Sequence, residues 1–178
     1  MESHCAFLVQ KSIYEHSRYT AAAWRQLFKE EDFKRAVDLA RWGNFPIGLG
    51  HVCEMVLSVF QRQRIGDPAV IAAGLAQCAV DIFARYPAPA GYPSTFWSDS
   101  GKDVSARLQR AAACEPRRVM DMPGERGREF FDRLPIHERL RGRDPGYVLN
   151  NLKGNLVQAH ETFLQRADLA ALADALSR

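Results

Sequence analysis

Four polar side chains on or beside apolar helical faces are the strongest candidates for chemistry. His160 lies within the apolar stripe of a helix expected over 145–166, and Lys153 lies seven residues earlier, about 20° away around that helix and about 10.5 Å along it. His16 lies at the edge of another apolar face, and Asp81 lies on a narrow polar stripe. An ammonium group buried alone would cost several kcal/mol, so we expect Asp81 to pair with Lys153.

This set of residues permits two interpretations. In the functional one, His160 is a general base, Lys153 stabilises charge, and His16 or Asp81 orients the base in a polar pocket of the helical bundle. In the structural one, a core histidine bonds a backbone carbonyl and the lysine extends to the edge of its helix. Helical spacing alone does not distinguish them.

His51 and Glu54 form the pair that most resembles a metal site. They lie one helical turn apart, but His51, Glu54, Ser58 and Arg62 share one arc of the helix. The opposite arc carries the expected core residues Val52, Cys53, Val56, Val59 and Phe60. Helical di-iron proteins use the reverse order, Glu-x-x-His, in two copies, and this sequence has no second copy of its pair. We therefore expect the arc to face solvent and to bind no metal, and the sequence identifies no cofactor.

The segment 87–100 is a candidate contact surface. It contains three prolines together with Tyr92, Phe96 and Trp97, which favours an ordered loop over a flexible linker. Exposed aromatic rings in a loop often bind a ligand or a partner. The alternative is that the three rings cover the core from outside.

Arginine is concentrated in one part of the chain. Residues 101–143 carry eleven basic and seven acidic residues, and this mixture predicts a salt-bridged surface rather than a nucleic-acid interface. Arg117 and Arg118 precede a turn where they could bind an anion, although adjacent loop arginines are usually solvated. The sequence alone does not decide whether the segment 107–143 binds an anionic partner.

The four cysteines show neither zinc-ligand nor redox-motif spacing, so we expect reduced thiols. The first ten residues lack the features of a signal peptide. Uncharged stretches reach about a dozen residues, whereas a membrane span needs about 20. The sequence therefore predicts a cytoplasmic protein that does not interact with membranes.

The apolar residues follow a 3.6-residue period almost everywhere, which predicts an all-α bundle of seven or eight helices in a single domain, 1–178. We expect helices over 3–29, 32–43, 47–64, 68–86, 101–115, 125–134 and 145–166, and a short one opened by Asp168.

Several helix ends have clear signals. Asp32 is expected to cap the helix over 32–43, which Gly43 ends. Asp67 is expected to cap the helix over 68–86. The helix over 68–86 is apolar around nearly its whole circumference, so we expect it to be the central, buried helix.

No nucleophile–base motif, phosphate-binding glycine loop or metal signature stands out in the sequence. We therefore predict a small soluble helical module that binds a small molecule or regulates a partner, and that self-associates. The alternative is a small-molecule enzyme using acid–base or metal-assisted chemistry around His160, Lys153, His16 and Asp81.

Overall fold

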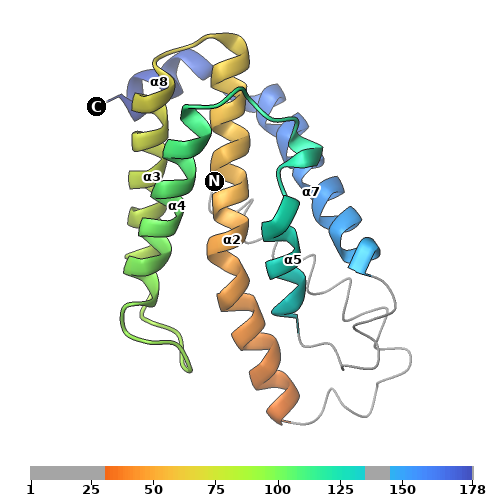
Figure 1. Cartoon of the computed structure of the whole chain (residues 1–178). Helices are drawn as coiled ribbons and strands as arrows, with labels where there is room; N and C mark the ends of the chain where they lie inside the picture. Colours follow the sequence, from red (N-terminus) through yellow and green to blue (C-terminus); the bar gives the residue numbers. More distant parts are fainter. Residues whose placement is uncertain (1–30, 135–144, 178) are drawn as a thin grey trace.

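The computed structural model describes residues 31–134 and 145–177, and these ranges contain six α-helices and no strand (Figure 1). The all-α prediction is confirmed. The described helices are α2 (Glu31–Gln63), α3 (Pro68–Phe83), α4 (Phe96–Ala112), α5 (Gly124–Asp132), α7 (Pro145–Arg166) and α8 (Leu169–Leu176), and a 3-10 turn, η2 (Val119–Asp121), precedes α5. Six helices in these ranges are fewer than the seven or eight expected, and the helix expected over 3–29 lies outside them.

One long helix, α2, replaces the two that were expected over 32–43 and 47–64. It continues through both Gly43 and Pro46, although an internal proline removes a main-chain hydrogen bond. Two side-chain hydrogen bonds join this part of α2 to the end of α5 and the residue after it. Asn44 Nδ2 donates to the carbonyl of Phe130 at 3.2 Å, and Arg133 donates to the carbonyl of Gly43. The expected break was wrong, and both of these bonds join α2 to residues 86 and 90 positions away in the sequence.

Gly43 marks a close approach of chain segments rather than a helix end. A Cβ atom at this position would overlap the hydroxyl group of Tyr92. That hydroxyl donates to the Leu39 carbonyl at 2.8 Å, which fixes the loop before α4 against α2. The cap expected at Asp32 was also wrong, because that residue lies inside the helix.

The central helix is α2 and not α3. Every residue from 43 to 60 is buried, and α2 packs against α3, α4, α5 and α7. By contrast, α3 leaves Val70 and Val80 each 40% exposed. The prediction of a central 68–86 helix was wrong because α3 is rich in alanine, whose small side chain adds little apolar area and can face water at small cost.

Two other predicted helix caps are confirmed. Asp67 and Asp168 each accept a hydrogen bond from a backbone amide in the first turn of the helix that follows, at 2.8 and 3.1 Å. The helix predicted over 145–166 is α7. α4 begins at Phe96, five residues before the predicted start, and so includes the end of the aromatic segment.

In the part of the chain that the structure describes, no helix is both long and apolar enough to cross a membrane.

Candidate functional site

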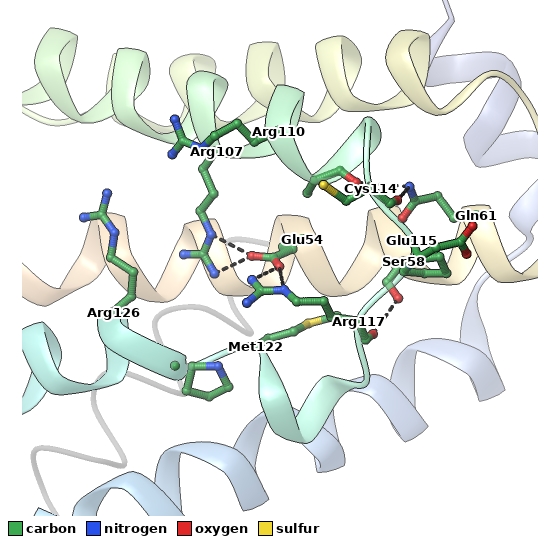
Figure 2. A pocket seen from close by; sticks show the side chains of 14 residues that line it. Glu54, Ser58, Gln61, Arg107, Arg110, Cys114, Glu115, Arg117, Met122 and Arg126 are labelled. Atoms are coloured by element: carbon green, nitrogen blue, oxygen red, sulfur yellow. Dashed lines mark hydrogen bonds and ion pairs between the residues drawn. The ribbon is translucent and has the colours of Figure 1, made fainter.

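A buried carboxylate, Glu54, holds two arginine side chains (Figure 2). The exposed fractions of the side chains are 4% for Glu54, 10% for Arg107 and 50% for Arg117. Arg107 donates from Nε to Glu54 Oε2 at 2.7 Å, and its Nη2 lies 2.5 Å from the same oxygen. Arg117 donates to the other oxygen, Oε1, from Nε at 2.9 Å and also from Nη2. Each carboxylate oxygen is therefore occupied by a different guanidinium group.

The polar stripe of α2 also fixes the segment that carries Arg117, between α4 and η2. Ser58 Oγ donates to the Arg117 carbonyl at 3.1 Å, and Arg62 Nη2 donates to the Pro116 carbonyl at 3.0 Å. Gln61 Nε2 lies within hydrogen-bonding distance of three carbonyls at the end of α4. These contacts hold the Arg117 backbone in place while its side chain reaches Glu54.

The prediction that this arc of α2 faces solvent is therefore wrong for three of its four residues and holds at Arg62, which is exposed. His51, Glu54 and Ser58 are all buried, because α4 and the segment after it cover the arc. Among the described residues, no group of three or more His, Cys, Asp or Glu side chains could hold a metal ion. The carboxylate of Glu54 is instead shared by two guanidinium groups.

Sequence reasoning missed Arg107, although its position carries a signal. The apolar positions of α4 include Val104, Leu108 and Ala111, and Arg107 lies three residues after the first and four before the last. This spacing places an arginine on the core-facing side of the helix. On α2, a Cβ atom at Gly50 would lie 3.2 Å from Arg107 Nη1, so the glycine leaves room for the guanidinium group.

A cavity of about 510 Å³ lies beside the Glu54 ion pairs. Its charged lining consists of four arginines, Arg107, Arg110, Arg117 and Arg126, and two glutamates, Glu54 and Glu115. Arg126 is paired with Asp103 and Glu129, at 2.5 and 2.8 Å. Arg110 forms no ion pair or hydrogen bond with any described residue. The lining residues alone carry an excess of two positive charges, but acidic side chains outside the lining already pair with Arg126. Arg110 is therefore the one lining guanidinium that no described residue holds.

His51 is held in its neutral form next to this site. Burial lowers the pKa of His51 well below its usual value of 6.5, and the positive charges of Arg107 and Arg117 add to this effect. The backbone groups of Pro123 and Ile47 act in the opposite direction, but neither ring nitrogen has a well-formed hydrogen bond. Protonation of His51 therefore requires local opening of the fold.

This burial predicts that the protein loses stability in mild acid. The unfolded state takes up a proton on His51 below pH 6.5 and the folded state does not, so stability is complete above that pH and falls below it. The slope contributed by one such proton is about 1.4 kcal/mol per pH unit. Urea unfolding between pH 7 and pH 5 should show this slope in the wild type and lose it in His51→Gln. His160 is the control, because it is partly exposed, and burial lowers its pKa as well. The variant His160→Gln should keep most of the slope. Equal slopes in the wild type and in His51→Gln would contradict the prediction.

The expected buried pair between Asp81 and Lys153 is not formed. Asp81 is exposed on α3 and accepts a hydrogen bond from Gln77 at 2.7 Å. Lys153 is half-buried on α7, close enough to Asp121 to contribute, after Arg118, to the lowered pKa of that carboxyl. α3 and α7 lie on opposite sides of α2 (Figure 1).

The other two residues of the predicted pocket are His160 and His16. His160 is half-buried on α7, and His16 lies outside the described residues. The structure therefore does not bring Asp81 together with Lys153 and His160, and the acid–base arrangement expected from helical spacing has no geometric support.

The three aromatic residues proposed as a contact surface pack against the core. Trp97 is buried and donates from Nε1 to the Pro87 carbonyl at 2.9 Å. The ring of Phe96 lies between its neighbours, with centroid distances of 4.3 Å to Tyr92 and 4.6 Å to Trp97. This geometry supports the alternative in which the rings cover the core.

The salt-bridged surface predicted for the arginine-rich segment is present where the structure describes it. The ion pairs include Arg118 with Asp121, Arg128 with Asp132 and Arg133 with Glu129. Arg117 differs from these because its partner, Glu54, lies on another helix and is buried.

The described cysteines are Cys53, Cys78 and Cys114, and all three are free thiols. Burial raises the pKa of Cys53 from 9.0 to about 12, so this thiol does not form a reactive thiolate near neutral pH.

The chain matches no protein-family model, no curated protein and no solved structure.

Proposed function

We propose that this protein binds a small anionic molecule, carrying at least two negative charges, in the arginine-lined cavity. The observation that carries the proposal is the positive charge beside this space of about 510 Å³: Arg107 and Arg117 share a single carboxylate, and Arg110 is unpaired among the described residues. Small-molecule sites typically occupy 300–1,000 Å³ and contain a few convergent polar groups. The cavity fits this description, and it agrees with the ligand-binding module predicted from the sequence.

The hydrogen-bond donors around the cavity outnumber the hydrogen-bond acceptors that the protein provides there. A guanidinium group carries five N–H donors, so Arg107 and Arg117 together carry ten, and only their Nε and Nη2 atoms contact Glu54. Arg110 adds five more that no described residue accepts. Oxygens of a phosphate or a polycarboxylate can accept several such donors in bidentate geometry.

A structural role alone does not account for Arg110. A buried ion pair needs only Glu54 and its two partners, whereas Arg110 is exposed and unpaired on the wall of the same cavity. Self-association and a regulatory role stay predictions from the sequence.

Calorimetric titration with inorganic phosphate and with citrate tests the proposal, with sodium chloride at matched ionic strength as the control for screening. We expect saturable binding of at least one of the two anions. Arg110→Gln should weaken it about tenfold, the equivalent of one charge-assisted hydrogen bond of about 1.5 kcal/mol. Folding should be unaffected, because this side chain is exposed.

Arg35→Gln is the matched control. It removes the same charge from an exposed position near the start of α2, and it lies nineteen residues from Glu54 along the helix, about 28 Å away. We expect wild-type affinity in this variant. Equal weakening by both substitutions, or no binding of either anion above the chloride control, would contradict the proposal.

A further inference from the structure

A second cavity of about 250 Å³ lies between α2, α7 and α8 and differs chemically from the arginine-lined one. Its walls are mainly apolar and include Val52, Met55, Val56, Phe163 and Leu172. The three α2 residues are at most 3% exposed, so the cavity reaches the core of the bundle. Natural cores rarely leave an unfilled apolar space of this size, because the lining side chains lose packing contacts there.

The polar groups of this cavity are few and have distinct roles. The hydroxyl of Thr162 donates to the Gln158 carbonyl of its own helix at 2.9 Å, so it needs no partner in the cavity. Arg166 is the one charged side chain among the lining residues, all of which are described. It is exposed and forms no ion pair or hydrogen bond with any described residue. The cavity therefore combines a mainly apolar interior with one free cation at the solvent side.

From this combination we infer that the cavity binds an amphipathic monoanion, a medium-chain carboxylate whose alkyl chain fills the apolar space and whose carboxylate pairs with Arg166. An apolar cavity of about 150 Å³ stays dry and binds benzene. At about 30 Å³ for each water-sized group, the present volume corresponds to an alkyl chain of about eight carbons. A guanidinium group pairs with a carboxylate in bidentate geometry.

The two cavities use different faces of α2. Glu54 and Ser58 face the arginine-lined cavity, whereas Val52, Met55 and Val56 line the apolar one. At 100° per residue, the centres of these two faces lie about 130° apart around the helix. Binding in the apolar cavity therefore does not depend on the function proposed for the other.

Calorimetric titration of the full chain with a series of linear carboxylates from butyrate to dodecanoate tests the inference. Affinity should rise about fourfold with each methylene group, and should stop rising once the chain exceeds about eight to ten carbons. Arg166→Gln should weaken octanoate binding about tenfold and leave the binding of 1-octanol unchanged. Arg35→Gln is the control for loss of surface charge and should bind octanoate like the wild type.

Leu172→Trp provides a second variant that fills the cavity while keeping its apolar contacts. It should abolish octanoate binding, and circular dichroism should confirm that the helices are intact. Phosphate titration of the same variant should be unchanged, which separates this inference from the function proposed above. No saturable binding of any chain length, affinity independent of chain length, or equal loss of octanoate and octanol in Arg166→Gln would overturn it.

Discussion

Glu54→Gln is expected to lower the free energy of unfolding by about 3–5 kcal/mol, the cost of removing one partner from a buried ion pair. The substitution keeps the size of the side chain and removes its charge, so Arg107 stays buried without a counter-ion. Arg117 is half exposed and can turn toward water, so most of the cost comes from Arg107. Urea unfolding monitored by circular dichroism measures the loss.

Glu115→Gln is the matched control for this prediction. Glu115 lines the same cavity, but it is exposed and forms no ion pair with a described residue, so its loss should change stability by less than about 0.5 kcal/mol. Adding Arg107→Met to Glu54→Gln should recover part of the stability, because the double variant buries no unpaired charge. A loss below about 1 kcal/mol in Glu54→Gln would show that the pair behaves like an exposed one.

Gly74→Ala is expected to destabilise the protein by about 1–3 kcal/mol, a cost typical of overpacking. A Cβ atom at Gly74 on α3 would overlap the carbonyl oxygen of Leu176, and it would lie 3.0 Å from the carbonyl carbon and the Cα of that residue. These are backbone atoms, so α8 has to move away from α3. Amide hydrogen exchange should show lower protection in α8, and urea unfolding should show the loss of stability.

Gly154→Ala is the opposite case on α7. A Cβ atom there meets nothing within 4 Å, and alanine is preferred over glycine inside helices by about 0.5–1 kcal/mol. This variant should therefore gain stability by that amount. If Gly74→Ala gained stability as well, the close contact between α3 and α8 would not exist in solution.

The amino-acid sequence by itself determined the fold class and the features that depend on neighbouring residues. The 3.6-residue period of apolar residues predicted helices throughout. Asp67 and Asp168 predicted helix starts correctly because the capping hydrogen bond joins atoms two or three residues apart. The sequence also identified the polar arc of His51, Glu54, Ser58 and Arg62, since positions on one helix fix which side chains share a face.

What the sequence did not contain was the identity of the neighbour that covers each face. An isolated helix places Glu54 in water, and only tertiary packing brings Arg107 and Arg117, 53 and 63 residues away, to the same carboxylate. The continuity of α2 has a similar origin. Gly43 and Pro46 favour a break locally, but the helix continues, and it is joined there to a remote segment by bonds from Asn44 to the Phe130 carbonyl and from Arg133 to the Gly43 carbonyl.

Helical spacing suggested that Asp81 and Lys153 meet, because each was the polar exception on an apolar face. The tertiary structure decided otherwise, since α2 lies between their helices and Asp81 is exposed. Secondary structure is set by interactions over a few residues, and a helical pattern limits which side chains share a face. Whether a charge on that face is buried depends on desolvation and on partners supplied by remote segments, and only the folded chain specifies those.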